Sequence, residues 1–178
     1  MKSAIIILTD GFEEMEALVP ADILRRAGVE VTLSSITGKL EVNGKNNIKI
    51  IADDLFLGNC DADMLILPGG PGASKYIESQ VLVDTLLDYN RQYKNIAAIC
   101  AAPVTLGKLG LLKDKAATCY PAMESELAAA TVKQETVVTD GNITTGRAAG
   151  ASAEFGLKLV EILVGADEAE RVRAAMYL

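Results

Sequence analysis

Short, mostly apolar runs alternate along the chain with longer segments in which apolar residues recur at helical spacing. The runs predict strands at residues 4–8, 30–35, 64–67 and 95–99. The longer segments predict helices at residues 13–27, 74–93, 104–112, 149–164 and 166–176. Strands that are apolar along most of their length are typical of parallel strands buried on both faces. The pattern therefore predicts an α/β fold, a flavodoxin-like three-layer sandwich with a mainly parallel central sheet.

Some segments depart from this regular alternation. Residues 36–52 are polar and rich in turn residues, and Asn43-Gly44 favours a hairpin there. Further short strands are predicted at residues 116–120, 136–139 and 142–145. No internal repeat, linker or low-complexity segment interrupts the 178 residues. One domain covering residues 1–178 is therefore expected.

Composition and charge exclude several classes of protein. Half of the residues are hydrophobic and 23% are charged, which is ordinary for an α/β domain. A formal net charge of −7 argues against nucleic acid and anionic membranes as partners. No apolar stretch approaches the roughly 20 residues that cross a bilayer. The N-terminal apolar run is too short for a secretory signal, and three scattered cysteines form no disulfide framework. We therefore expect a cytoplasmic protein.

The chain contains no histidine. Cys–His and Ser–His catalytic pairs are excluded for that reason, even across an interface between identical chains. Zinc and non-haem iron sites that include histidine are excluded as well. We expect neither a metal ion nor a cofactor.

Cys100 is the strongest candidate for a reactive residue. It ends the strand at residues 95–99, and Ala101, Ala102 and Pro103 then open a helix. This arrangement places a nucleophile at a helix N-terminus, where amide N–H groups and the helix dipole favour the thiolate. We therefore expect the pKa of Cys100 to lie about two or more units below the free value. The alternative is a buried structural cysteine at a strand end.

Two more loops follow the carboxyl ends of predicted parallel strands, as Cys100 does, so we expect them at the same edge of the sheet. Ligands of such sheets bind at this edge. The loop at residues 10–16 holds Glu16, which an apolar stretch follows directly. A carboxyl group drawn inward there has a raised pKa and can hydrogen-bond a thiolate. Glu13 and Glu14 are interpreted as solvated residues that complement the helix dipole.

The second loop, Pro68-Gly69-Gly70, brings bare backbone amides close to this edge. It lacks the Lys-Ser/Thr ending of a phosphate-binding loop, so nucleotide binding is disfavoured. The better functional interpretation is that its N–H and the Ala101 N–H bind an oxyanion, and the alternative is a plain tight turn. Cys60 is interpreted as structural or incidental. Cys119 and Tyr120 are adjacent in a predicted strand, so at most one of them faces Cys100.

Five motifs resemble, in order and spacing, those of the ThiJ/PfpI superfamily, and most of all its parkinsonism-associated protein deglycases. They are Glu13-Glu14-Met15-Glu16, Arg25-Arg26-Ala27-Gly28, Leu67-Pro68-Gly69-Gly70, Ala97-Ala98-Ile99-Cys100-Ala101 and Glu154-Phe155. The resemblance extends over nearly the whole chain. It implies a flavodoxin-like fold, usually a homodimer, with Met15 near the dimer interface.

The resemblance also implies roles for individual residues. Cys100 matches the reactive, oxidation-prone cysteine, and Glu16 matches a protonated carboxyl that is hydrogen-bonded to it. Gly70 and Ala101 match the positions whose amides form the oxyanion pocket, and Gly69 and Tyr120 are expected in the same pocket. Tyr120 is a departure, because the family pattern has a histidine there. A phenol donates a hydrogen bond but is a poor base at neutral pH, which counts against hydrolase chemistry of the family type.

Two classes of function stay open. The first is a glyoxalase or deglycase that acts without a cofactor on a small dicarbonyl or a glycated substrate, through the Cys100 thiolate and a proton on Glu16. The second is a non-enzymatic oxidative-stress sensor or redox-controlled chaperone, in which Cys100 is oxidised. A peptidase is disfavoured because the chain has no histidine.

Overall fold

A seven-stranded sheet forms the centre of the structure, a computed structural model that describes residues 1–58, 60–128 and 130–178. Its strands are β1 (Ser3–Leu8), β2 (Glu30–Ser35), β5 (Asp54–Leu55), β6 (Met64–Leu67), β7 (Asn95–Ile99), β10 (Val137–Asp140) and β11 (Ile143–Gly146). They lie in the order β10-β11-β7-β6-β1-β2-β5. The β10–β11 pair is antiparallel, and the other neighbouring pairs are parallel. The predicted fold class is confirmed.

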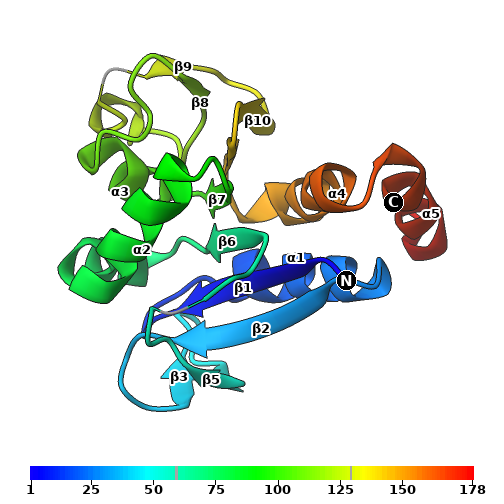
Figure 1. The fold of residues 1–178 in the computed structure, drawn as a ribbon, viewed down its shortest axis with the longest axis horizontal. Coiled ribbons are helices and arrows are strands. Elements are labelled where there is room, and N and C mark those ends of the chain that lie inside the picture. The colour runs from blue at the N-terminus through cyan, green and yellow to red at the C-terminus, as the bar shows by residue number, and fades with distance from the viewer. Residues whose placement is uncertain (59, 129) are drawn as a thin grey trace.

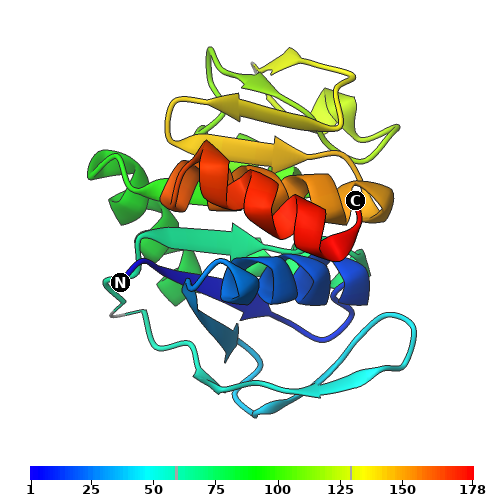
Figure 2. The same ribbon diagram turned by 90° about the vertical axis from the view of Figure 1, so that its right-hand side faces the viewer.

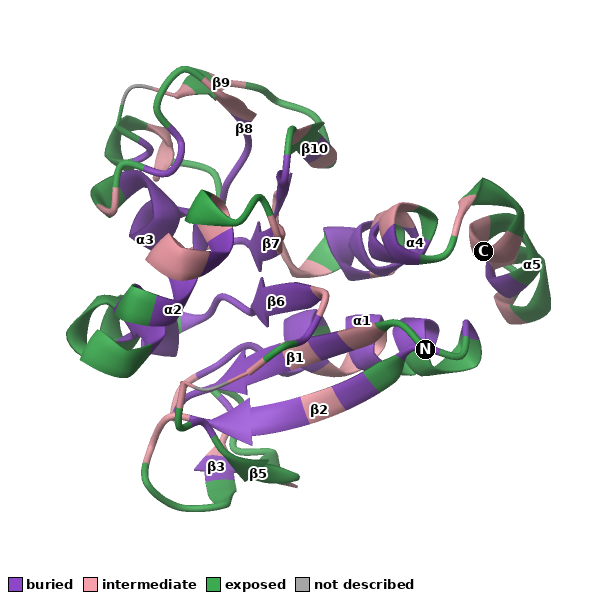
Figure 3. Cartoon of the chain, in the orientation of Figure 1, coloured by how far each residue is buried: buried purple, intermediate pink, exposed green. Residues whose placement is uncertain are grey.

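Helices cover both faces of this sheet (Figure 1). Helices α1 (Glu14–Arg26) and α4 (Ser152–Leu163) lie on one face, with α5 (Ala166–Met176) beside α4 (Figure 2). Helices α2 (Gln80–Arg91) and α3 (Pro103–Lys108) lie on the other. Strand β1 shows how one strand serves both layers: Ile6 packs into the α1–α4 core, whereas Ile7 packs into the α2–α3 core. The central strands are accordingly buried (Figure 3).

Two small sheets lie outside the central one. Strands β3 (Glu41–Asn43) and β4 (Lys49–Ile51) form the hairpin predicted within residues 36–52. Its turn is longer than an Asn-Gly turn, since Gly44 N donates to Ile48 O at 2.9 Å. Strands β8 (Ala116–Ala117) and β9 (Thr131–Val132) form a short parallel pair. No helix among the described residues is long and apolar enough to span a membrane.

The structure corrects several predicted boundaries. The helix predicted at residues 74–93 is two elements, a 3₁₀ helix η1 (Pro71–Glu78) and then α2, because the Ser79 side chain caps α2 by accepting from Leu82 N. The helix predicted at 104–112 ends at Lys108. The strand predicted at 116–120 ends at Ala117, because the next amide, Thr118 N, donates to the Thr145 side chain at 2.9 Å. Two more 3₁₀ helices are η2 (Glu124–Glu126) and η3 (Ala149–Ala151).

Candidate active site

Three neighbouring strands, β1, β6 and β7, bring the candidate residues to one edge of the sheet. Glu16 lies in the first turn of α1 after β1, Gly69 and Gly70 follow β6, and Cys100 follows β7. Glu13 N donates to Gly69 O at 3.0 Å, which joins the first two loops directly. The structure thus brings these residues together as the sequence predicts.

Cys100 occupies a sharp elbow between β7 and α3. Its φ is 65°, in the left-handed region that costs a non-glycine residue roughly 1–2 kcal/mol. Cys100 N donates to Gly146 O at 2.9 Å, and Ala102 N donates to Ile99 O at 3.1 Å, so neighbouring backbone holds the turn. A non-glycine residue held at positive φ is a feature often associated with functional sites.

Glu16 lies behind Cys100 and is fully buried. Its Oε2 accepts a hydrogen bond from Gly69 N at 2.7 Å, and the Cys100 thiol is the other neighbour of the carboxyl group. A Cβ atom at Gly69 would lie 2.7 Å from both Cys100 Cβ and Glu16 Oε2. Only glycine therefore allows the sulfur and the carboxyl group to approach each other at this point.

Burial opposes ionisation of both groups. It raises the pKa of the Glu16 carboxyl to about 7 and, together with the Glu16 carboxylate, raises the pKa of the Cys100 thiol to about 12. The Gly70 and Ala101 amides lower the thiol's pKa but do not outweigh burial. The expected Cys100 pKa below the free value is therefore wrong, because burial of the thiol and the nearby Glu16 carboxylate outweigh the two amides.

The two groups nevertheless share one negative charge above about pH 7. When the thiol proton passes to Glu16, the repulsion between the two groups disappears. The sulfur then gains the Glu16 O–H as a donor beside the Gly70 and Ala101 amides. The arrangement thus allows a thiolate to form by proton transfer within the pair, without loss of a proton to water.

The two amides are placed by backbone that depends on glycine. Gly70 has a φ of 86°, and a Cβ there would lie 2.6 Å from both Glu13 N and Gly11 O. Ala101 directly follows the Cys100 elbow and precedes α3. The N–H groups of Gly70 and Ala101 lie close enough to the Cys100 thiol to lower its pKa, so they are placed to reach an oxygen atom bonded to a carbon on that sulfur.

A cavity of about 360 Å³ adjoins Cys100. Helices η1 and α3 form its sides, and residues from the segment 118–126 complete it. Tyr120 lines this cavity, and Tyr120 N donates to Cys100 O at 2.7 Å. Gly69, which the sequence predicts in the same pocket, is not among the residues that line this cavity and lies between Cys100 and Glu16.

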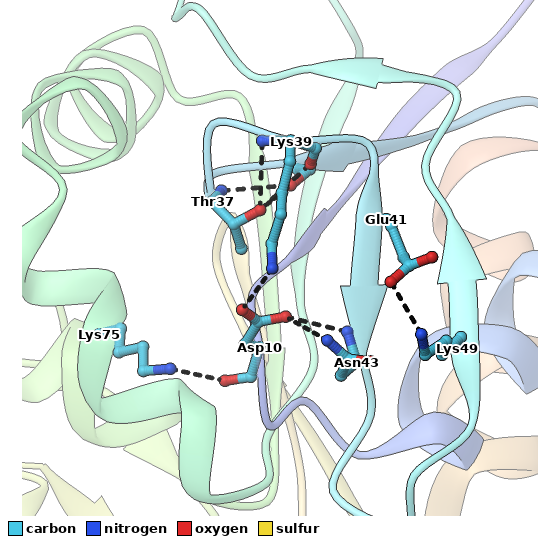
Figure 4. Close-up of polar contacts among 8 residues, drawn as sticks. Asp10, Thr37, Lys39, Glu41, Asn43, Lys49 and Lys75 are labelled. Atoms are coloured by element: carbon cyan, nitrogen blue, oxygen red, sulfur yellow. Dashed lines mark hydrogen bonds and ion pairs between the residues drawn. The ribbon is translucent and has the colours of Figure 1, made fainter.

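The loop that carries Glu16, residues 10–16, is called the acid segment below. Asp10 ties its start to three other elements (Figure 4). Asp10 Oδ1 accepts from Asn43 N at 2.9 Å, and Asp10 Oδ2 lies 3.5 Å from Lys39 Nζ. Lys75 Nζ, on η1, donates to the Asp10 carbonyl at 3.0 Å. The sequence predicts no role for Asp10, whose only signal is its place just after the first strand.

The first two glutamates of α1 are not the solvated residues that were predicted. Glu13 and Glu14 are both buried. Glu13 is the N-cap of α1, since its Oε2 accepts from Glu16 N at 3.0 Å. Glu14 contacts the turn of the β3–β4 hairpin through Asn46. Both carboxylates accept hydrogen bonds in these positions, which compensates for their removal from solvent.

The remaining cysteines lie apart from the reactive pair. Cys60 is partly buried, with its sulfur 3.4 Å from the Tyr89 hydroxyl, and it is not among the residues that line the Cys100 cavity. Cys119 is buried and Tyr120 is half-exposed, and of the two only Tyr120 lines the cavity, although the strand predicted to hold both ends at Ala117. Among the described residues, no group of three or more acidic or cysteine side chains is arranged to hold a metal ion.

Comparison with known proteins agrees with this fold and these motifs. Protein dj-1beta of Drosophila melanogaster is 39% identical over 176 residues, or 96% of this chain and 94% of that protein. The crystal structure of Drosophila DJ-1beta has a TM-score of 0.94 at 37% identity and covers 99% of this chain and 98% of its own. Oxidized DJ-1 of Toxoplasma gondii has a TM-score of 0.96 at 31% identity, with the same coverage.

A further relative carries a name that describes an activity. The glutathione-independent glyoxalase DJR-1.2 of Caenorhabditis elegans is 31% identical over 172 residues, covering 94% of this chain and 91% of that protein. The model of the DJ-1/PfpI family matches residues 2–162. The resemblance found in the sequence is thereby confirmed, and the chain belongs to the DJ-1/PfpI family.

Proposed function

We propose that the chain is a cofactor-independent enzyme of the glyoxalase or deglycase type, acting on reactive dicarbonyls such as methylglyoxal or on their glycated adducts. The observation that carries the proposal is the contact of the Cys100 thiol with the Glu16 carboxyl and two amide donors, beside an open cavity. The relative named a glutathione-independent glyoxalase supports the reaction class.

The first step is addition of the thiol to the aldehyde of methylglyoxal. The Cys100 sulfur bonds to the aldehyde carbon as its proton passes to the Glu16 carboxylate. The Gly70 and Ala101 amides hold the oxygen atom on which negative charge develops. Glu16 then returns the proton, and the product is a neutral hemithioacetal. A carboxyl group with a pKa near 7 is suited to accept and release a proton at neutral pH.

The later steps regenerate the enzyme without an external oxidant or reductant. The hemithioacetal carbon loses its hydrogen as a proton, and the adjacent ketone carbon gains a proton, so the intermediate becomes a lactoyl thioester. Water hydrolyses this thioester to lactate and returns the Cys100 thiol. Methylglyoxal and one water thus become lactate, and one carbon is oxidised while its neighbour is reduced.

The test is production of lactate from methylglyoxal by the purified protein. Activity should be lost in Cys100→Ser, because a serine hydroxyl is a far weaker nucleophile without a strong base. The matched control is Cys60→Ser, which should retain the wild-type rate. A wild-type protein that forms no lactate would refute the enzyme proposal.

A second candidate, an oxidative-stress sensor or redox-controlled chaperone, is favoured by the same amides. A sulfinate on Cys100 would carry oxygen atoms that the Gly70 and Ala101 N–H groups can reach. The oxidized DJ-1 structure of Toxoplasma gondii is a relative in which oxidation is recorded. Mass spectrometry after peroxide treatment should then find oxidation at Cys100 before Cys60 or Cys119, in a protein inert toward methylglyoxal.

The proposal includes a homodimer in the reducing cytoplasm, where Cys100 stays unoxidised. Met15, which the family resemblance associates with the dimer interface, is half-exposed in the first turn of α1. A partner on that face would lie next to the turn that carries Glu16. A monomeric mass in equilibrium sedimentation would contradict this part of the proposal.

A further inference from the structure

The acid segment is held on one side by the turn of the β3–β4 hairpin, residues 43–48, called the hairpin turn below. Gly11 N donates to Asn43 O at 2.7 Å, and Lys45 N donates to Phe12 O at 2.9 Å. On its other side the segment is held by the loop after β6, where Gly69 O accepts from Glu13 N at 3.0 Å, and by η1, where Gly72 N donates to Gly11 O at 2.9 Å. Glu16 therefore lies at the end of a segment that is fixed from two directions.

Glu14 makes the side-chain contact between α1 and the hairpin turn. Its Oε1 accepts from Asn46 N at 2.7 Å, and its Oε2 accepts from Asn46 Nδ2 at 2.8 Å. Both oxygens of one carboxylate are thus used by one residue. A Cβ atom at Gly44 would overlap Glu14 Oε1, so glycine is needed there for the turn to approach.

Glu14 is ionised in this contact. Burial alone would raise the pKa of its carboxyl group, but hydrogen bonds from backbone N–H groups, including its own and that of Asn46, outweigh burial and lower the pKa. Two hydrogen bonds from one residue fix the orientation of a buried carboxylate as well as stabilising it. The contact therefore fixes the orientation of the first turn of α1 relative to the hairpin turn.

The same turn of α1 carries Glu16. Glu14 contacts the hairpin turn, whereas Glu16 contacts Gly69 N and Cys100, so a rotation that loosens one contact moves the other. The charged and titratable groups that act on Glu16 are Cys100, Glu13, Lys45 and Tyr76. Lys45 belongs to the hairpin turn, and its charge lowers the pKa of Glu16. The hairpin turn thus affects both the position and the proton affinity of Glu16.

We propose that Glu14 and Asn46 form a clamp that positions Glu16 against Cys100, so that the hairpin turn controls proton transfer within the reactive pair. Glu14 is then a positioning residue, since it touches neither the sulfur nor the cavity. The inference rests on the Cys100–Glu16 chemistry proposed above, but it does not depend on methylglyoxal being the substrate.

The variant that breaks the clamp is Asn46→Asp, which sets two carboxylates against each other. Glu14→Gln alone is a weaker test, because the Asn46 amide can turn over and offer its oxygen to the new amide. Glu14→Gln added to Asn46→Asp restores the contact with donor and acceptor exchanged. The probe is alkylation of Cys100 by iodoacetamide, followed by mass spectrometry of the Cys100 peptide across pH.

Asn46→Asp should slow alkylation at pH 7.5 by at least about fivefold, since a misplaced reacting group can cost up to ~10²-fold. Its pH midpoint should move, and the double variant should return both quantities to within about twofold of wild type. The control is Glu41→Gln, which breaks the exposed Glu41–Lys49 pair of the same hairpin (Figure 4). It should change neither quantity.

The clamp is overturned if Asn46→Asp lowers the melting temperature but leaves the alkylation rate and midpoint unchanged. It is also overturned if the double variant regains stability without regaining the wild-type profile. Alkylation needs no glyoxalase turnover. A protein that forms no lactate but shows the rescued profile would therefore refute the enzyme proposal and keep the clamp.

Discussion

The acid segment, residues 10–16, and the segment 118–126, called the outer segment below, both reach Cys100 but are held differently. The acid segment bonds to the loop after β6 and to the hairpin turn, and Glu13, Glu14 and Glu16 are all buried. The outer segment contacts Cys100 through Tyr120 N; Thr118 and Cys119 at its start are buried, whereas the side chains of Tyr120 and Glu126 are half-exposed.

This difference indicates that proton transfer depends on the acid segment, whereas substrate access to the cavity depends on the outer segment. Glu16 approaches the sulfur from behind, at the end of a backbone segment that is hydrogen-bonded to the loop after β6 and to the hairpin turn. Tyr120, at the position where the family pattern has histidine, approaches the cavity from the solvent side. A replacement in the outer segment can therefore change what enters the cavity while the Cys100–Glu16 pair stays intact.

Glu16→Gln should give the largest effect. It keeps an oxygen for the Gly69 N–H but cannot accept the thiol proton, so methylglyoxal turnover should fall by about 10²–10⁴-fold, the usual contribution of a positioned acid or base. The matched control is Glu124→Gln, the same change at an outer-segment residue that is not among those lining the cavity. It should stay within about twofold of wild type. Similar losses of turnover in the two variants would contradict the assignment of proton transfer to the acid segment alone.

The pH profile of the same variant sharpens the result. Below about pH 7 Glu16 is protonated and cannot take the thiol proton, so alkylation of wild-type Cys100 should slow as the pH falls through about 7. In Glu16→Gln the thiol must lose its proton to water, and burial still raises its pKa. Its profile should therefore move to alkaline pH, and an unchanged midpoint would show that Glu16 is not the acceptor.

Gly70→Ala should rank second, as a test of how tightly the acid segment is held. A Cβ there meets Glu13 N and Gly11 O at 2.6 Å, so we expect a loss of about 2–4 kcal/mol in unfolding free energy from the clash and the positive φ together. Gly110→Ala is the control, because Gly110 also has a positive φ but a Cβ there meets nothing within 4 Å. It should cost only about 1–2 kcal/mol. Urea unfolding measures the free energy of unfolding of both variants. Equal losses would mean that the acid segment moves aside for the added Cβ at little cost.

Tyr120 substitutions should have the smallest effect. Tyr120→Phe removes one hydroxyl group from a half-exposed side chain, and we expect a loss of about 0.5–1.5 kcal/mol in transition-state stabilisation. Tyr120→His should be neutral or harmful if Cys100 and Glu16 suffice. Steady-state kinetics with methylglyoxal measures both variants. An inert wild type and an active Tyr120→His would show instead that the missing imidazole was a required base.

Much of the fold could be predicted from local pattern. The apolar runs identify the central strands, and parallel strand ends meet at one edge, so the meeting of Glu16, Gly70 and Cys100 follows from topology. The break between η1 and α2 could not be predicted in this way. The spacing of apolar residues is similar on both sides of Ser79, and the separation depends on its side chain accepting from Leu82 N.

Two features of the site depend on residues distant in the sequence. Glu14 has the pattern of a solvated residue in a first helical turn, and its burial results from Asn46, which comes 32 residues later. The pKa of Cys100 was predicted from the elbow, the helix N-terminus and an acid partner taken to be protonated. Its actual direction is decided by burial and by Glu16, neither of which acts through neighbouring residues of the chain.

The left-handed backbone at Cys100 has a consequence for how this protein tolerates mutation. Glycine is the one residue that adopts a φ of 65° without steric cost, so at this position the sequence best suited to folding is chemically inert. Selection for stability alone would therefore replace Cys100 with glycine. A natural variant with glycine at position 100 should be read as loss of chemistry with the fold retained, and not as damage to the protein.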